Sequence, residues 1–329
     1  MSAPARFRFV VAESYPASAL ERLRAFGDVV ELPDPTPDAL ISALPGTHAL
    51  LIRSRTHVTA RILEAAAALR VIGRAATSVD HIDLRVAARR NIVVVYAPHA
   101  GVRSLAEFTV AMLLAAQRRL IFLDRHVRAG QFESLRETHG RELRHHVVGL
   151  FGMSRVADEV GAMLAESFGC KVIYHDRSGR TPTRVQAEAV SQDALFERSD
   201  ILSLHLALDP STRQIINAAV LGRMPAGAIL VNTSRGGLID SAAVADALKA
   251  GRLRGAAIDV FDTEPLPAEH ALRTAPNCIL TPHVGSLTTD ARDALFDVVD
   301  DVLGVLAGQP PRHPAAIEPA PPRAASATA

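Results

Sequence analysis

Short apolar runs alternate with longer segments whose apolar residues recur at helical spacing, from the first residues to about position 300. The runs are rich in Val, Ile and Leu and are apolar at consecutive positions, which is typical of parallel strands covered by helices on both faces. They lie at 6–12, 48–53, 69–74, 91–97, 147–152, 171–176, 200–206, 228–232, 255–260 and 277–283. This alternation predicts an α/β fold with parallel sheets.

The pattern changes in two places. Residues 104–120 predict one long helix, and an Arg/His-rich stretch follows it to His146. Such a helix could join two domains or pack against a second subunit. From Gln309 onward the chain is dominated by Pro and Ala, so we expect a disordered tail over 313–329 and no regulatory domain beyond residue 312.

Composition narrows the classes of function. The chain has 329 residues, enough for two domains, and is 48% hydrophobic with a net charge of +1. That balance gives no electrostatic case for nucleic acid or a membrane surface. No apolar run approaches the roughly 18 residues of a membrane helix, and the N-terminus has no signal peptide pattern. The two cysteines favour a cytoplasmic setting, and no Cys/His spacing indicates a metal.

Residues 147–168 predict a strand, a tight turn at Gly152 and a helix, which is the setting of a dinucleotide-binding loop. The helix N-terminus would offer unpaired N–H groups to the pyrophosphate. A second strand ends at Asp176, 24 positions after Gly152, where a carboxylate that binds the adenosine ribose is expected. Asp176 favours NAD because it would repel a 2′-phosphate, although the neighbouring Arg177 weakens that preference.

Two positions of the usual G-x-G-x-x-G pattern are not glycine. Ser154 stands where the backbone approaches the phosphate, and Ala157 stands where helix and strand pack closely. A serine fits the loop if its φ is ordinary, and its hydroxyl could then donate to a phosphate. The alternative is a βαβ unit that holds no ligand.

Three later segments carry candidate catalytic side chains, each directly after a predicted strand. They are "NTSRGGLID" with Arg235, "AAIDVFDTEP" with Glu264 and "TPHVGS" with His283. The carboxyl ends of parallel strands meet at one edge of a sheet, so we expect these three residues to converge there. Each residue taken alone could equally be an ordinary surface or capping group.

With "SDILSLHLALDPSTRQII" and "LAEFTVAMLL", these segments resemble the D-isomer-specific 2-hydroxyacid dehydrogenase family over about residues 48–308. The resemblance implies two Rossmann-like lobes with the active site in the cleft between them. The substrate-binding, flavodoxin-like domain would comprise 1–98 with 288–312, and the NAD-binding Rossmann domain 99–287. It also implies a homodimer joined through 104–146.

The resemblance assigns a role to each catalytic candidate. His283 would be the general acid and base, a role that suits an imidazole near neutral pH. Glu264 would bind the other ring nitrogen and fix the tautomer. Arg235 would hold the substrate carboxylate in its planar fork.

The same resemblance extends the ligand sites. The cofactor positions are Gly152, Ser154, Arg155, Val156, Asp176, Leu206, Ala207, Thr212, Thr233, Ser234, Asp259 and Gly285. The substrate positions are Arg53, Arg55, Ala76, Thr77, Ser78 and Arg235. The segment with Arg53 and Arg55 is similar to the phosphoglycerate dehydrogenase branch, where arginines help to hold a phosphate. Ala76 and Ser78 replace two glycines of that family's substrate loop, and either would be strained at positive φ.

The sequence therefore predicts an NAD(H)-dependent oxidoreductase that interconverts a D-2-hydroxy acid and its 2-oxo acid. A phosphorylated substrate such as 3-phosphoglycerate is one candidate, and a glyoxylate/hydroxypyruvate-type reductase is the alternative. A third reading, from another class, is a non-catalytic nucleotide-sensing interaction protein on the same fold.

Overall fold

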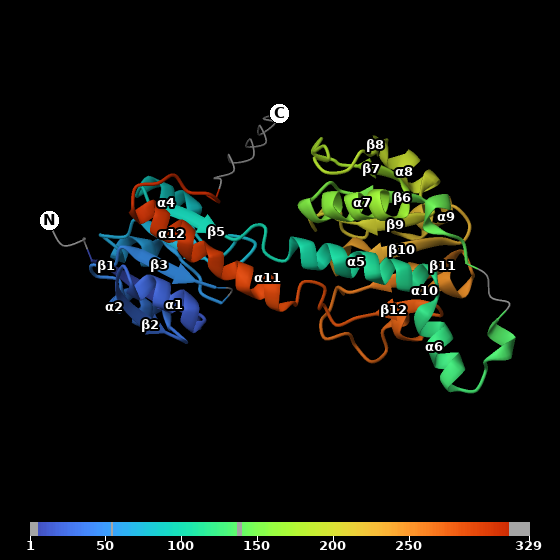
Figure 1. Ribbon diagram of the computed structural model, residues 1–329, viewed down its shortest axis with the longest axis horizontal. Helices are drawn as coiled ribbons and strands as arrows, with labels where there is room; N and C mark the ends of the chain where they lie inside the picture. The colour runs from blue at the N-terminus through green and yellow to red at the C-terminus, as the bar shows by residue number, and fades with distance from the viewer. Residues whose placement is uncertain (1–5, 54, 137–139, 316–329) are drawn as a thin grey trace, which may run out of the picture. The chain divides into compact units, whose positions relative to one another are not determined.

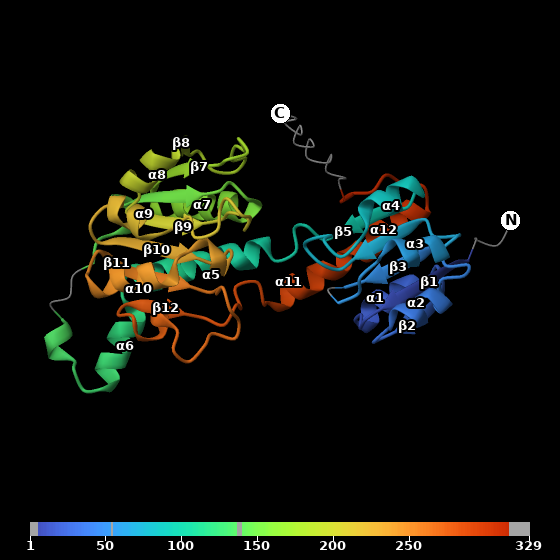
Figure 2. The same ribbon diagram turned by 180° about the vertical axis from the view of Figure 1, so that it is seen from behind.

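The computed structural model describes residues 6–53, 55–136 and 140–315 and divides the chain into two compact units. The first unit is Met1–Ala100 with Thr289–Ala329, and the second is Gly101–Thr288. Each unit is a parallel β-sheet covered by helices on both faces, which confirms the predicted α/β class (Figure 1 and Figure 2).

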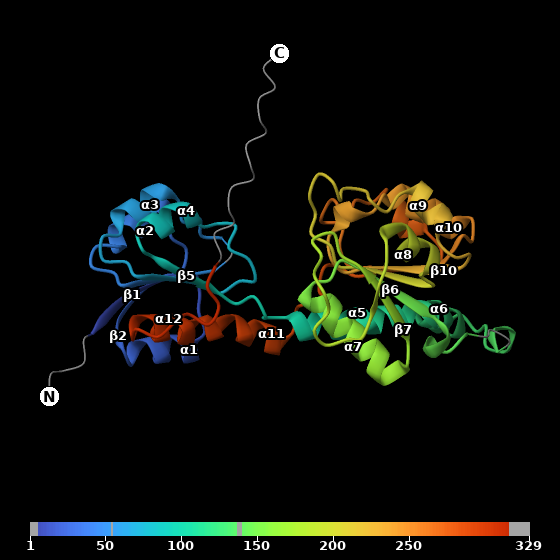
Figure 3. The same cartoon turned by 90° about the horizontal axis from the view of Figure 1, so that it is seen from above.

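The first unit has a five-stranded sheet in the order β2-β1-β3-β4-β5, and all its strand pairs are parallel. Helices α1 and α12 cover one face, while α2, α3 and α4 cover the other (Figure 3). Its elements are β1 (Phe7–Ala12), α1 (Ala17–Arg24), β2 (Gly27–Leu32), α2 (Pro37–Ala43), β3 (Ala49–Ile52), α3 (Ala60–Ala65), β4 (Val71–Arg74), α4 (Leu84–Arg89), β5 (Val93–Tyr96), α11 (Thr289–Ala294), η5 (Leu295–Asp297) and α12 (Val298–Leu306).

The second unit has a seven-stranded parallel sheet in the order β12-β11-β10-β9-β6-β7-β8. Helices α5 and α7 cover one face, and α8, α9 and α10 cover the other (Figure 3). Its elements are α5 (Val102–Gln117), α6 (Leu120–Arg128), η1 (Glu133–Leu135), η2 (Leu143–His145), β6 (Val147–Phe151), α7 (Arg155–Phe168), β7 (Lys171–His175), β8 (Glu188–Ala189), α8 (Gln192–Arg198), β9 (Ile201–Leu204), α9 (Ala218–Arg223), β10 (Ala228–Asn232), η3 (Gly236–Leu238), α10 (Ser241–Lys249), β11 (Leu253–Ile258), η4 (Ala271–Thr274) and β12 (Cys278–Leu280).

The helix predicted over 104–120 is two helices. Helix α5 ends at Gln117, and Arg119 takes a left-handed conformation with φ +55° before α6 begins at Leu120. A left-handed residue directly after a helix is a common way to end it, so the chain changes direction at this point. Within the described residues, no helix has the length and apolar content to cross a bilayer.

Residues 313–315, which composition placed in the disordered tail, are held against the first unit. The buried Asp301 carboxylate accepts hydrogen bonds from the amides of Arg312 and His313, and Ala315 N–H donates to Val94 O. Pro314 pairs with the edge strand β5. Proline is tolerated at the edge of a sheet because it need not donate an N–H to a strand on its outer side. Residues 316–329, the rest of the predicted tail, lie outside the described residues.

Both sheets have a point where the strand order reverses, and ligands bind at the carboxyl ends of the strands at such points. In the second unit, β6 lies between β9 and β7, and the loop after β6 begins at Gly152. In the first unit, β1 lies between β2 and β3, and Glu13 and Arg53 follow β1 and β3.

Candidate active site

The turn after β6 requires a glycine. Gly152 has φ +92°, and a Cβ there would lie 2.9 Å from the carbonyl carbon and oxygen of His205. Its N–H donates to His175 O at 2.8 Å. The turn therefore packs directly on the backbone that follows β9, and no side chain fits between them.

The serine in this loop is unstrained and begins helix α7. Ser154 has φ −79°, and its Oγ accepts a hydrogen bond from Ala157 N–H at 3.1 Å. The amides of Arg155 and Val156 donate to none of the described residues, so they are available at the positive end of the helix. Helix α7 packs closely on β6 at Gly161, where a Cβ would lie 3.0 Å from Leu150 Cδ1.

Asp176 connects the loops that follow β6 and β7. Its Oδ2 accepts from Met153 N–H at 2.8 Å, and its Oδ1 accepts from Ser178 N–H, Ser178 Oγ and Arg180 N–H at 2.9, 2.6 and 3.0 Å. Partial burial raises the pKa of Asp176, but these hydrogen bonds outweigh it and the net pKa is below the usual value. The carboxylate is therefore ionised at neutral pH and keeps an open acceptor position on Oδ2.

Several predicted cofactor positions make hydrogen bonds within the second unit, either through their own hydroxyl groups or through their backbone carbonyl groups. The pairs are Ser234 Oγ with Leu206 O at 2.7 Å, Thr212 Oγ1 with Ala207 O at 2.9 Å, and Thr233 Oγ1 with Thr109 Oγ1 at 2.8 Å. Thr212 and Thr233 are buried, so their hydroxyls are used inside the unit and fix the loops that follow β9 and β10.

Glu264 and His283 form a hydrogen-bonded pair. His283 Nδ1 lies 2.9 Å from Glu264 Oε2, and Phe261 N–H donates to Glu264 Oε1 at 3.0 Å. The hydrogen bond from Phe261 lowers the pKa of Glu264, partial burial opposes it, and His283 reinforces it. Because an ionised carboxylate only accepts, Nδ1 carries the proton and Nε2 is left for another partner.

The loop that bears His283 is fixed by Asp259. His283 has φ +55°, and its amide donates to Asp259 O at 2.8 Å. The buried Asp259 carboxylate accepts from Thr281 Oγ1, Val284 N–H and Gly285 N–H at 2.6, 3.0 and 3.0 Å. These bonds hold the imidazole-bearing turn in a conformation that is uncommon outside glycine.

Arg235 lies on the loop after β10, next to the loop that carries Glu264. Its guanidinium is exposed and donates to Ser234 O at 2.7 Å, and its own carbonyl accepts from Asn232 Nδ2 at 3.0 Å. A Cβ on Gly236 would lie 1.9 Å from the carbonyl carbon of Phe261, so the two loops touch through their backbones. The three candidate residues thus follow β10, β11 and β12, which are adjacent in the sheet.

In the first unit, the predicted substrate arginines follow β3. Arg53 Nη1 donates to Ser14 O at 3.2 Å, and Arg55 Nη1 lies 3.3 Å from Asp34 Oδ1. Glu13, which the sequence analysis did not single out, accepts hydrogen bonds from the amides of both arginines. Its position directly after the first apolar run was the available signal.

The altered substrate loop after β4 is relaxed. Ala76 and Ser78 both lie outside the positive-φ region, so neither is strained. Ala76 N–H donates to Arg74 O at 2.8 Å, and Ala76 O accepts from Ala97 N–H at 3.0 Å, while Thr77 is exposed. This loop therefore does not depend on the glycines that its sequence lacks.

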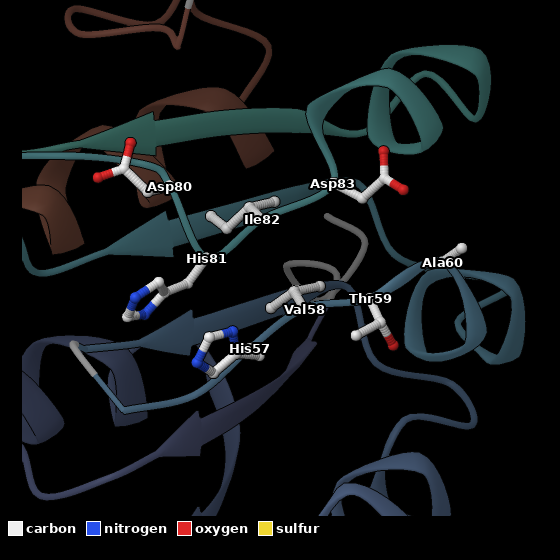
Figure 4. A pocket seen from close by; sticks show the side chains of 8 residues that line it. All are labelled: His57, Val58, Thr59, Ala60, Asp80, His81, Ile82 and Asp83. Carbon is white, nitrogen blue, oxygen red and sulfur yellow. The ribbon is translucent and has the colours of Figure 1, made fainter. Parts of the chain in front are cut away.

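A hollow of about 280 Å³ lies beside these loops (Figure 4). The imidazoles of His57 and His81 stack across it, with ring centroids 4.1 Å apart and planes 18° apart. Val58 and Ile82 form a parallel bridge, so the loops after β3 and β4 are joined. The side chains lining it are those of His57, Val58, Thr59, Ala60, Asp80, His81, Ile82 and Asp83.

Known proteins resemble this chain in sequence and in fold. Residues 110–285 match the model of the NAD-binding domain of D-isomer specific 2-hydroxyacid dehydrogenases. The chain belongs to that family. It is 34% identical over 318 residues to a glyoxylate reductase of Thermofilum pendens, covering 93% of this chain and 94% of the relative. It is 37% identical over 299 residues to a D-3-phosphoglycerate dehydrogenase of Mycobacterium leprae, covering 88% of this chain.

Some of the relatives are longer than this chain, and others match it along nearly their whole length. The chain spans about half the length of the D-3-phosphoglycerate dehydrogenases it matches, 56% in the case of the M. leprae protein. Among solved structures, the TT0316 protein of Thermus thermophilus superposes with a TM-score of 0.77 at 34% identity, covering 94% of this chain and all of that one. An NADPH-dependent glyoxylate/hydroxypyruvate reductase of Sinorhizobium meliloti superposes with a TM-score of 0.76 at 27% identity, covering 94% and 98%.

Proposed function

We propose that the chain is an NAD(H)-dependent oxidoreductase that interconverts a D-2-hydroxy acid and its 2-oxo acid. The observation that carries this proposal is the Glu264–His283 pair, whose side chains lie 2.9 Å apart, together with the backbone contact between the Glu264 loop and the Arg235 loop. Proton transfer to or from an oxygen and recognition of a carboxylate are the two tasks this reaction requires of a protein.

The residues around Gly152 fit a dinucleotide. The positive φ of Gly152 lets the backbone turn closely, the free amides of Arg155 and Val156 suit a pyrophosphate, and Asp176 keeps an acceptor for a ribose hydroxyl. When bound, the dinucleotide supplies or accepts the hydride. We assign nucleotide binding to the second unit, and we propose NAD as the cofactor because the Asp176 carboxylate disfavours a 2′-phosphate.

The chain's own residues supply the proton and the orientation. His283 holds a proton at Nε2 and delivers it to the carbonyl oxygen in the direction of reduction. Glu264 accepts from Nδ1 throughout, which keeps the ring orientation and stabilises the imidazolium. Arg235 binds the substrate carboxylate with two parallel N–H donors.

We propose a phosphorylated acid, such as 3-phosphoglycerate, as the first candidate substrate. Arg53 and Arg55 supply two guanidinium groups at the carboxyl end of β3, beside β1, where the sheet order reverses. The names of the mycobacterial relatives support the same class of substrate. We assign substrate binding to the first unit, together with Ala76, Thr77 and Ser78.

A glyoxylate/hydroxypyruvate-type reductase is the second candidate. The Thermofilum glyoxylate reductase matches along nearly its entire length, whereas the phosphoglycerate dehydrogenases extend well beyond the matched region. If the first candidate is correct, the enzyme should prefer a substrate with a phosphate group. If the second is correct, it should prefer a substrate without one.

Steady-state reduction of a panel of 2-oxo acids, with and without a phosphate and with NADH or NADPH, tests the proposal. We expect turnover, D-configured products and the higher kcat/KM with NADH. A chain that binds NADH and turns over none of the acids would instead support the nucleotide-sensing alternative.

We also propose a homodimer joined through 104–146, in a cytoplasmic setting. Helix α6 buries none of its side chains in the chain itself, and the large apolar residues Leu120, Ile121, Val127 and Phe132 on and after it are 43–56% exposed. Leu120 and Val127 are seven residues apart and share a helix face, which a second copy could cover. Light scattering should give the mass of two chains, and Leu120→Asp with Val127→Asp should give one; a wild-type monomer would overturn this.

A further inference from the structure

A buried acid lies at the carboxyl ends of the paired strands β1 and β3. Glu13 follows β1, is 5% exposed, and faces the turn that follows β3, about forty positions later in the chain. Strand β1 is the point at which the sheet order of the first unit reverses, because β2 lies on one side of it and β3 on the other. A charged group buried there needs partners of its own.

The partners of Glu13 are hydrogen-bond donors from a single turn. Its Oε1 accepts from the amides of Arg53, Arg55 and Thr56 at 3.1, 3.2 and 3.0 Å, and from Thr56 Oγ1 at 2.9 Å. Backbone N–H groups that lie close together in the chain and point at one oxygen can form an anion site. In this chain the anion is the protein's own carboxylate.

The charge on Glu13 is maintained at neutral pH. Burial raises the pKa of Glu13, but the hydrogen bonds from Thr56, Arg55 and Arg53 together lower it below the usual value. The backbone of Glu13 has φ +71°, which is uncommon for a residue with a side chain, and its amide donates to Leu32 O at 2.9 Å. Strained residues persist where surrounding contacts hold them, and they gather at functional sites.

The same arrangement positions both arginines. Arg53 Nη1 donates to Ser14 O at 3.2 Å, and its guanidinium lies 5.6 Å from the centre of the Phe296 ring. Arg55 Nε lies 3.6 Å from Glu13 Oε2. Glu13 therefore fixes the backbone of both arginines and contacts one of the two guanidinium groups directly.

We propose that Glu13 is a positioning residue for the recognition of a dianionic substrate, acting through the turn that bears Arg53, Arg55 and Thr56. The carboxylate binds the amides of both arginines and lies 3.6 Å from Arg55 Nε, so it fixes the backbone from which the two guanidinium groups reach the second negative charge of the substrate. The inference rests on the proposed function, since it assumes that this unit binds the acid.

Glu13→Gln removes the charge with little change in size, and Glu31→Gln on the exposed face of β2 is the matched control. We expect Glu13→Gln to raise KM for a phosphorylated 2-oxo acid by about tenfold, the loss of one charge-assisted hydrogen bond. KM for glyoxylate, kcat and the Kd for NADH should stay within about twofold, since those depend on other groups. A purely structural role would change all of these values together with the melting temperature, and that result overturns the proposal, as does an unchanged KM.

A second variant tests the anion site without turnover. Glu13→Gly removes the carboxylate and leaves a residue that accepts positive φ. The donors from Arg53, Arg55 and Thr56 then lack an acceptor, so sodium acetate should raise the melting temperature of Glu13→Gly more than that of the wild type. Equal effects of acetate on both proteins would refute the site. A wild type that reduces no 2-oxo acid would refute the proposed function. The acetate measurement tests the Glu13 site separately, because it does not require turnover.

Discussion

The substitution Glu264→Gln leaves the His283 imidazole in place but weakens the contact that orients it. It therefore tests whether the orientation of that ring matters for the reaction. The change keeps the size of the side chain and removes the negative charge that accepts from Nδ1 at 2.9 Å. A hydrogen bond to a charged partner contributes about 1.5–3 kcal/mol. The side chains of His283 and Glu264 are 53% and 38% exposed, so the lower end applies, and about 1.5 kcal/mol corresponds to roughly tenfold in kcat.

A larger loss, up to about a hundredfold, is expected if the amide also lets the ring take its other tautomer. The assay is steady-state oxidation of NADH by the preferred 2-oxo acid, with NADH affinity measured separately by fluorescence. Glu269→Gln, on the same loop and exposed, is the control. An unchanged kcat in Glu264→Gln would refute the role assigned to Glu264, and so would an equal loss of NADH affinity.

Three further predictions follow from the second unit. Burial lowers the pKa of His205 from 6.5 to about 4, so this imidazole is protonated at a higher pH in the unfolded chain than in the folded one. About 3 kcal/mol of folding stability should therefore be lost as the pH falls from 6.5 to 4. Urea unfolding across that range should show the loss and His205→Gln should reduce it; identical pH profiles would contradict the assignment. Gly152→Ala should weaken NADH binding and lower the melting temperature, because its Cβ would lie 2.9 Å from the His205 carbonyl, and wild-type affinity would show that the turn can adjust. Ser154→Ala removes a helix cap and should cost about 1 kcal/mol of stability, whereas Ser154→Gly should cost a few tenths and leave NADH affinity intact. A large loss of affinity in Ser154→Gly would instead make the hydroxyl a phosphate ligand.

The features of the fold and the site that depend on local sequence patterns can be predicted from the sequence. The alternation of apolar runs and helical segments predicts both parallel sheets, and Arg235, Glu264 and His283 are recognisable because each follows a strand end. These features depend on residues close together in the chain, so periodicity and position reveal them.

The features that sequence reasoning missed depend on distant partners. Glu13 is bound by amides about forty residues away, and no local pattern indicates that a carboxylate there is buried. The end of α5 before Arg119 follows from a left-handed backbone that an arginine does not signal. Pro314 is ordered because β5 has a free edge to pair with.

The altered glycine positions show the same limit. Ser154, Ala76 and Ser78 occupy positions where glycine is usual, and strain there depends on a φ value that the sequence does not reveal. None of the three has a positive φ, and Ser154 also caps α7. Gly152 is the position where the conformation does require glycine.

The most direct test of the central claim is the reduction of 2-oxo acids with NADH by wild type and His283→Ala, with the configuration of the product determined. We predict that the wild type forms the D-2-hydroxy acid and that His283→Ala binds NADH with wild-type affinity but loses reduction. A His283→Ala protein that reduces the acid at the wild-type rate would contradict the account.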